Sequence, residues 1–221
     1  MTSQQARRLD RLLSGTYGRN PFYTRKFDKA GITVRDLRFP DDLALLPLTT
    51  KAELVADQAA NPPWGTALGE PIERYTRYCQ TSSTSGFPLR WLDTNESWQW
   101  LVGCWKAVYR AARVGPGDRV FFPFSFGPFL GFWLAFEAAP QIGALAVPGG
   151  GMSSELRLAT IEKTGATVVC CTPTYALWLA EVAQASGARP LAEGAVRVLI
   201  VAGEPGGSIA ATRERIERSW G

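Results

Sequence analysis

Hydroxyl side chains gather in one short segment, which reads Thr81-Ser82-Ser83-Thr84-Ser85-Gly86-Phe87-Pro88. Serine and threonine donate O–H hydrogen bonds, the N–H groups of a loop can converge on one anion, and glycine permits the positive φ that such a loop requires. The segment therefore predicts a loop that holds phosphate groups. A Ser/Thr-rich loop is also typical of a solvated linker, and composition alone leaves both interpretations open.

The chain of 221 residues contains no histidine. This excludes within it the Ser-His-Asp and Cys-His catalytic arrangements and the commonest zinc sites. Chemistry here depends instead on bound phosphates, a metal ion carried in with a nucleotide, backbone dipoles and carboxylates. The four cysteines show no CxxC spacing, and we interpret them as buried structural residues: Cys79, Cys104, Cys170 and Cys171.

Composition indicates a globular protein, because 46% of the residues are hydrophobic and the net charge is only +4. Basic residues are scattered among acidic ones, without the Lys/Arg stripe of a nucleic-acid-binding surface. Apolar runs such as residues 129–139 are too short to span a bilayer, and Arg7, Arg8 and Arg11 occupy the region where a signal peptide is apolar. These features predict a cytoplasmic protein that binds neither nucleic acid nor a membrane, and the mild positive charge is compatible with an anionic small molecule.

The chain changes character near residue 73. Residues 1–73 predict a helical N-terminal segment packed on the main body: Asn20 precedes Pro21 as an N-cap should, and Thr50 with Glu53 forms a capping box. Residues 74–221 predict an α/β nucleotide-binding subdomain. Its strands are expected at 75–79, 89–92, 119–124, 144–147, 166–171 and 196–201. Helices are expected at 95–113, 129–139, 154–164, 173–184 and 209–219, with Thr94, Ser153 or Ser154, and Ser208 as caps.

The strands are continuously apolar and alternate with helices, which predicts a mostly parallel sheet flanked by helices on both faces. In such sheets ligands collect beyond the carboxyl ends of the strands. Three features are expected at such ends: the hydroxyl segment, the turn at residues 125–129 and the turn at residues 202–205.

Five segments, in this order, carry a family resemblance: residues 21–32, 46–54, 81–88, 143–177 and 202–217. Together they resemble the N-terminal part of a phenylacetate-CoA ligase-like enzyme, within the superfamily of adenylate-forming acyl-CoA synthetases. The resemblance spans nearly all of the chain. It implies the incomplete N-terminal domain of an AMP-forming acid-thiol ligase, in which a carboxylic acid attacks ATP to give an acyl adenylate and CoA then displaces AMP.

The resemblance also implies roles for residues. The nucleotide would be held by Thr81, Ser82, Ser83, Thr84, Ser85 and Gly86 at its phosphates and by Ala202, Gly203, Glu204 and Pro205 at its adenine and ribose. An aromatic acid would contact Phe126, Gly127, Phe129 and Tyr175, and Mg²⁺ would enter with ATP. No catalytic residue and no metal ligand is assigned within the chain.

Other interpretations stay open for several of these residues. Glu204 can be a carboxylate near the positive end of the helix that follows it. Most of the aromatic residues between positions 121 and 136 can be core, and Tyr175 can be a buried tyrosine with a satisfied hydroxyl. Ser83 stands where the family usually has glycine, Phe87 where it has lysine, and Cys79 where it often has histidine.

The resemblance places Gly221 before the family's Tyr-Gly-x-x-Glu segment and before the small domain that carries the catalytic lysine. The expectation is an N-terminal fragment that is inactive alone. Two other functions remain open: an adenylating enzyme that loads a carrier-protein thiol, and a non-catalytic nucleotide-binding module. The identity of the acid is open, and a homodimer is possible.

Overall fold

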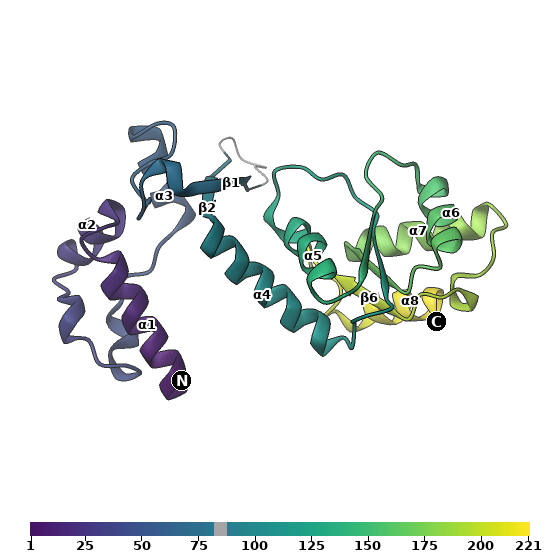
Figure 1. Ribbon diagram of the computed structural model, residues 1–221, viewed down its shortest axis with the longest axis horizontal. Coiled ribbons are helices and arrows are strands. Elements are labelled where there is room, and N and C mark those ends of the chain that lie inside the picture. The colour runs from purple at the N-terminus through teal and green to yellow at the C-terminus, as the bar shows by residue number, and fades with distance from the viewer. Residues whose placement is uncertain (82–87) are drawn as a thin grey trace. The chain divides into compact units, whose positions relative to one another are not determined.

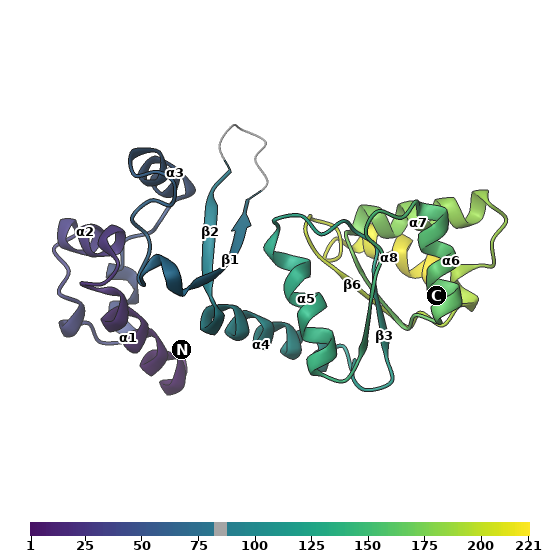
Figure 2. The ribbon, with the colours of Figure 1, turned by 45° about the horizontal axis from the view of Figure 1, so that its top comes forward.

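The computed structural model describes residues 1–81 and 88–221, and the chain forms two compact units, Met1–Asn95 and Glu96–Gly221 (Figures 1 and 2). The division predicted after residue 73 stays a prediction, and the strands at 75–80 and 90–94 belong to the first unit. No helix among the described residues is both long and apolar enough to cross a membrane.

The first unit is built from three helices, three short 3-10 helices and a two-stranded sheet. In chain order these are α1 (Ser3–Thr16), α2 (Pro21–Lys29), η1 (Val34–Asp36), η2 (Asp41–Leu45), α3 (Lys51–Ala60), η3 (Ile72–Arg74), β1 (Tyr75–Gln80) and β2 (Arg90–Thr94). The two predicted caps are confirmed: Asn20 accepts a hydrogen bond from the Tyr23 N–H, and Thr50 and Glu53 form a capping box. Leu13, Phe27, Val34 and Leu37 form a small core.

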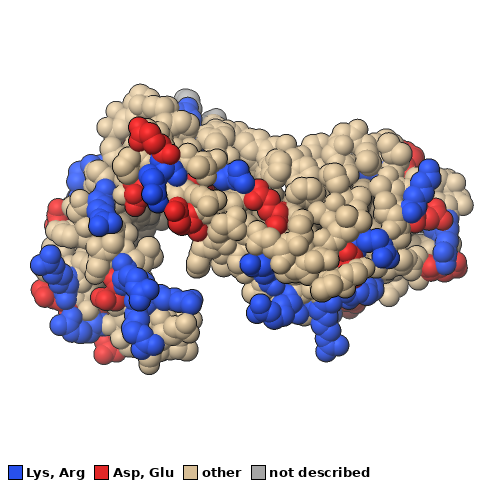
Figure 3. All heavy atoms as spheres, in the orientation of Figure 1, with Lys and Arg blue, Asp and Glu red and all other residues tan. Residues whose placement is uncertain are grey.

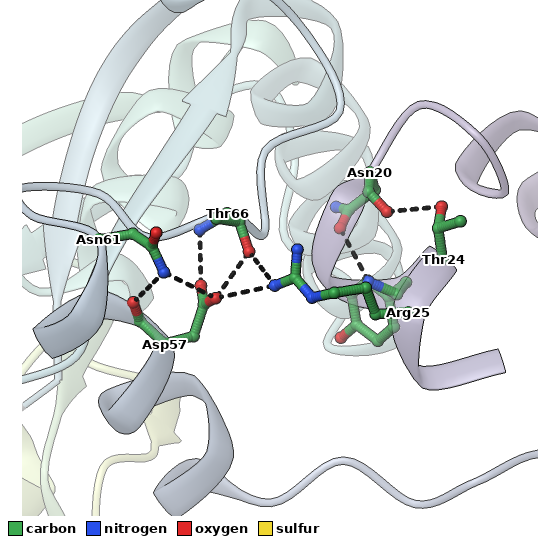
Figure 4. A network of polar contacts seen from close by, with 7 residues as sticks. Asn20, Thr24, Arg25, Asp57, Asn61 and Thr66 are labelled. Atoms are coloured by element: carbon green, nitrogen blue, oxygen red, sulfur yellow. Dashed lines mark hydrogen bonds and ion pairs between the residues drawn. The ribbon is translucent and has the colours of Figure 1, made fainter. Parts of the chain in front are cut away.

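A polar network joins α2 to α3 and to the turn that follows it (Figure 4). Asp57, whose side chain is 7% exposed, accepts hydrogen bonds from the hydroxyl and the backbone N–H of Thr66 and from Arg25. Gly65 lies so close to the Asp57 side chain that a Cβ at this position would be 2.5 Å from Asp57 Oδ2. Buried carboxylates need such partners, so this network fixes the chain entering β1.

The capping box of α3 also carries a pH-dependent contact. Hydrogen bonds from Lys26, then from the Thr50 backbone and hydroxyl, lower the pKa of Glu53 to about 2. A carboxyl whose folded pKa is depressed stabilises the fold above its unfolded value and loses that contribution as pH falls toward its folded value. We expect the melting temperature of Glu53→Gln to lie below that of the unmodified protein above about pH 4.5, with the difference vanishing near pH 2 in a thermal scan series. A difference of equal size at pH 7 and pH 2.5 would contradict this.

The hydroxyl segment connects β1 and β2, which are antiparallel neighbours and share no strand with the larger sheet. The Thr81 N–H donates to the Leu89 carbonyl and the Leu89 N–H donates to the Thr81 hydroxyl, both at 3.0 Å. The prediction that this segment follows a strand of the parallel sheet is therefore wrong. A connection this short permits only antiparallel pairing, because a parallel pair requires a crossover of a dozen or more residues.

The second unit is an α/β layer structure. It contains α4 (Asn95–Ala111), β3 (Arg119–Phe122), α5 (Leu130–Gln141), β4 (Leu145–Pro148), α6 (Ser154–Thr164), β5 (Val168–Cys171), α7 (Pro173–Ala185), η4 (Leu191–Glu193), β6 (Val198–Val201) and α8 (Ala210–Trp220). All four strands are parallel, in the order β4-β3-β5-β6. The predicted parallel sheet flanked by helices is confirmed.

Helices cover both faces of this sheet. Alternate residues of a strand face opposite sides, so neighbouring residues of β3 pack against different helices. On one face Phe121 and Val169 join a core formed with α6, α7 and α8. On the other, the ring of Phe122 lies 5.2 Å from that of Phe136 on α5, and the Tyr109 hydroxyl of α4 donates to the Ala135 carbonyl. The sheet is therefore doubly wound, with α5 on one side and α6 and α7 on the other.

Three local predictions are wrong. The last helix is capped by Ile209, without a side-chain hydrogen bond, and not by Ser208. Cys104 is exposed, because it lies on the outer face of α4, whereas the other three cysteines are buried. The strand expected to reach Phe124 ends at Phe122, since Pro123 has no N–H to continue the ladder.

Candidate functional site

The carboxyl ends of the four parallel strands lie at one edge of the sheet, and each is followed by a loop that enters a helix. The chain leaves β3 toward α5 on one face and leaves β5 toward α7 on the other face. Between β3 and β5 this divergence opens the crevice in which doubly wound sheets bind their ligands. We take this carboxyl edge, formed by the loops after β3, β4, β5 and β6, as the candidate site.

Glu204, in the loop after β6, is held by the N-terminus of α7. Its Oε1 accepts hydrogen bonds from the backbone N–H of Thr174, at 2.8 Å, and from the Thr174 hydroxyl. These bonds, the hydroxyl first, lower the pKa of Glu204, so the carboxylate is charged at neutral pH. It thus caps the helix before it in the chain, not the helix after it.

The neighbours of Glu204 bring the loop close to β5. The Ala202 N–H donates to the Cys171 carbonyl, and Gly203 adopts a φ of +95°, which favours glycine. Pro205 is exposed, as are Gly203 and Glu204. The predicted nucleotide-binding turn therefore presents backbone and carboxylate at the candidate site.

Tyr175 connects the loop after β4 to the start of α7 through Arg157. Arg157 donates from Nη1 to the Tyr175 hydroxyl at 2.6 Å and from Nε to the Gly149 carbonyl at 3.0 Å. The Tyr175 hydroxyl also pairs with Ser154 Oγ at 3.1 Å. Tyr175 is half-buried with a satisfied hydroxyl, the structural role left open for it.

Arg157 was not among the predicted site residues, because its position in α6, three residues after Ser154, carries no motif. The signal that was present is the Gly149-Gly150-Gly151 run before α6, since a glycine run has no side chains to anchor it and needs an outside donor to fix its carbonyls.

The turn after β3 is held by aromatic packing. The Phe126 ring lies 4.5 Å from Trp133 and 4.9 Å from Phe136, and Trp133 Nε1 donates to the Gly127 carbonyl at 2.8 Å. Phe129 is 50% exposed and is the N-cap of α5, with no side-chain hydrogen bond to the helix. Phe126 therefore packs inward, while Phe129 and the N–H groups of the first turn of α5 face outward at the candidate site.

The loops contact one another along this edge. The Gly149 N–H donates to the Phe122 carbonyl, and a Cβ at Gly150 would lie 3.3 Å from the Phe124 carbonyl. Contacts thus run from Glu204 through α7 and Arg157 to the glycine run and the aromatic turn. Eight of the predicted residues lie on the segments that follow the strands at this edge: Phe126, Gly127, Phe129, Tyr175, Ala202, Gly203, Glu204 and Pro205.

The predicted phosphate loop belongs to the other unit. Thr81 closes the β1–β2 hairpin, and Ser82, Ser83, Thr84, Ser85 and Gly86 lie outside the described residues. Their role stays a prediction. Within residues 1–81 and 88–221, no group of three or more His, Cys, Asp or Glu side chains could hold a metal ion.

Two comparisons identify relatives of the chain, although no protein-family model matches it. It is 30% identical to the phenylacetate-coenzyme A ligase of Escherichia coli (strain K12) over 218 residues, which cover 98% of the chain and 48% of that protein. It is also 30% identical to the phenylacetate-coenzyme A ligase of Thermus thermophilus over 186 residues, 84% of the chain and 41% of that protein.

Solved structures give the same result. An open conformation of 2-hydroxyisobutyryl-CoA ligase, in complex with 2-HIB-AMP and CoA, matches 98% of the chain with a TM-score of 0.90 and 28% identity. The same ligase in its thioesterification state matches the whole chain with a TM-score of 0.91. The chain covers 50% and 48% of these two structures. It is thus a homologue of the phenylacetate-coenzyme A ligases, with the fold of the N-terminal part of adenylate-forming CoA ligases, and it spans about half of their length.

Proposed function

We propose that this chain serves the ATP-dependent activation of a carboxylic acid, which is joined to AMP and then transferred to CoA. One observation carries the proposal. Contacts join the loops at the carboxyl edge of the sheet, from Glu204 to the aromatic turn, in a chain that is 28% identical to a ligase solved with 2-HIB-AMP and CoA.

Each part of the edge suits one part of an acyl adenylate. The Ala202–Pro205 turn offers a charged carboxylate and a glycine against which a flat base can lie. The first turn of α5 offers N–H groups that no side chain caps, which suit the carboxylate or phosphate oxygens of the reacting centre. Mg²⁺ would arrive with ATP and neutralise its phosphates.

We further propose that the acid is aromatic. Phe129 is exposed at the edge. In the same turn the Phe126 ring lies 4.9 Å from the rings of Phe124 and Phe136 and 4.5 Å from that of Trp133. Such surfaces bind aromatic rings by stacking and edge contacts. The curated relatives are named for phenylacetate, whereas the solved relatives are named for a small hydroxy acid, so the experiment must separate the two classes.

Calorimetry with acyl-sulfamoyl adenosines, stable analogues of acyl adenylates, tests both levels of the proposal. We expect the phenylacetyl analogue to bind at least tenfold more tightly than the 2-hydroxyisobutyryl analogue. The reverse order would overturn the aromatic acid and keep the adenylate site. No binding of either analogue would overturn the adenylate site itself.

A variant of Glu204 tests the nucleotide end of the site. Glu204→Gln keeps an acceptor for Thr174 but removes the charge, and a hydrogen bond to a charged group is worth about 1 kcal/mol more than a neutral one. We expect the affinity for AMP to fall about fivefold. Glu214→Gln, an exposed change on α8 that removes the pair with Arg218, is the matched control and should leave the affinity unchanged. Equal affinities for the two variants would show that Glu204 only caps α7.

A further inference from the structure

Asp118 is a buried carboxylate at the amino edge of the parallel sheet, the edge opposite the candidate site. It directly precedes β3, and its side chain is 11% exposed. Oδ1 accepts a hydrogen bond from the Thr167 hydroxyl at 2.7 Å, and Oδ2 accepts from the Gly115 N–H at 2.9 Å and from Arg197 Nη2 at 2.7 Å. Burial raises the pKa of Asp118, but these hydrogen bonds lower it by more, so the carboxylate is charged at neutral pH. A buried charge that lies away from the ligand edge requires its own explanation.

The contacts of Asp118 tie together the amino ends of three strands. Asp118 directly precedes β3, Thr167 directly precedes β5 and Arg197 directly precedes β6. Because β5 lies between β3 and β6 in the sheet, the bond from Arg197 to Asp118 passes across the end of β5 and ties β6 to β3. Arg197 Nη2 also donates to the carbonyl of Arg113, in the turn after α4, and Lys and Arg side chains gather over the C-terminal part of that helix (Figure 3). An ionised carboxylate is electrostatically favoured beneath such a basic surface.

The apolar sequence of β6 specifies its register only weakly. Val198, Leu199, Ile200 and Val201 are all half-buried, and among the described strands β6 pairs with β5 alone. A slip by one residue exchanges the two faces of a strand, whereas a slip by two keeps each side chain on its own face. A slip of β6 by two residues therefore replaces apolar side chains by other apolar side chains over much of its length, and packing discriminates poorly against it. Such a slip would move the turn after β6 by about 6.6 Å.

We propose that Arg197 and Asp118 are positioning residues for the nucleotide site: their ion pair fixes the register of β6, and β6 places the Ala202–Pro205 turn. The inference rests on the function proposed above for that turn. A slip by two residues takes the Arg197 guanidinium away from Asp118 and leaves a buried carboxylate without its cation, which is strongly unfavourable. The same slip carries Glu204 away from the Thr174 N–H. Polar contacts at both ends of β6 thus supply the register that its apolar residues do not.

Calorimetry with AMP tests the positioning role in Arg197→Met. We expect the affinity to fall about fivefold or more, since only molecules with β6 in register bind. Arg119→Met is the matched control, because the Arg119 side chain lies at the same edge and also donates two hydrogen bonds, to the carbonyls of Gly165 and Gly117 and not to β6. It should lower the stability to urea to a similar extent and leave the affinity unchanged. Equal affinities of the two variants would overturn the positioning role.

Hydrogen exchange tests the register without any nucleotide. In Arg197→Met we expect the N–H groups of β6, and the Ala202 N–H that donates to the Cys171 carbonyl, to exchange about tenfold faster relative to those of β3. The ratio should be unchanged in Arg119→Met. Arg197→Lys keeps a cation beside Asp118 and should restore slow exchange.

The two measurements separate this inference from the proposed function. An unchanged exchange ratio in Arg197→Met, or an Arg197→Lys protein that exchanges as fast as Arg197→Met, would overturn the role of the ion pair in fixing β6. If the unmodified protein fails to bind AMP while the ratio changes as expected, the proposed function is overturned and the role of the ion pair in fixing β6 is supported.

Discussion

Phe122→Ala is expected to lower the free energy of unfolding of the second unit by about 3–5 kcal/mol. Phe122 is fully buried in the central strand β3, and its ring makes edge contacts with Phe124 at 5.9 Å and with Phe136 at 5.2 Å. Truncation removes the transfer free energy of the ring and leaves a cavity between β3 and α5, which a close-packed sheet cannot fill. Urea unfolding followed by circular dichroism measures the loss.

The control for this prediction is Phe129→Ala, seven residues along the chain. Phe129 is 50% exposed, so its removal should cost less than about 1 kcal/mol while weakening the binding of the phenylacetyl adenosine analogue. The two variants thus separate stability from binding. A Phe129→Ala protein as unstable as Phe122→Ala would place the Phe129 ring in the core and remove it from the candidate site.

Arg157→Met is expected to cost about 2–3 kcal/mol, because it deletes two charge-assisted hydrogen bonds, to Tyr175 and to the Gly149 carbonyl. Gly149 is buried, so its carbonyl loses this donor in a place where water has poor access. We expect the loop after β4 to lose its fixed position and the affinity for acyl-adenylate analogues to fall with it. Urea unfolding and calorimetry on the same protein measure the two effects.

Tyr175→Phe is the matched control for Arg157→Met. It removes the hydroxyl partner of Arg157 but leaves the bond to Gly149, so it should cost about 1 kcal/mol. Because the two residues touch, the double variant should lose less than the sum of the single losses. Strict additivity would mean that Arg157 and Tyr175 act independently and that the connection between α6 and α7 does not pass through them.

Local signals in the sequence located most elements. Asn20 with Pro21, and Thr50 with Glu53, start helices where predicted, because a cap is made within four consecutive residues and needs no distant partner. Ser208 was a weaker signal, since no acidic or amide residue follows it at the third position, and the helix starts after Ile209 instead. The parallel sheet was predictable because strands buried on both faces are continuously apolar.

The candidate site was only partly predictable. Ala202–Pro205 and the aromatic turn were placed by the rule that ligands bind at the carboxyl edge, and the strands end where that rule needs them. The hydroxyl segment was placed at the same sheet on the same reasoning, which failed because the pairing partner of β1 is β2 and not β3. Pairing between strands depends on contacts that the local pattern does not contain.

By itself, the sequence determined the α/β class, the caps, the absence of histidine chemistry and the resemblance to adenylate-forming ligases, because each follows from residue types and spacings along the chain. Only the tertiary structure decided that Glu204 caps α7 from thirty residues away and that Arg157 holds Tyr175 and Gly149 together. The physical reason is common to both. A hydrogen bond or a buried face depends on which groups meet in space, and the order of strands in the sheet sets those meetings.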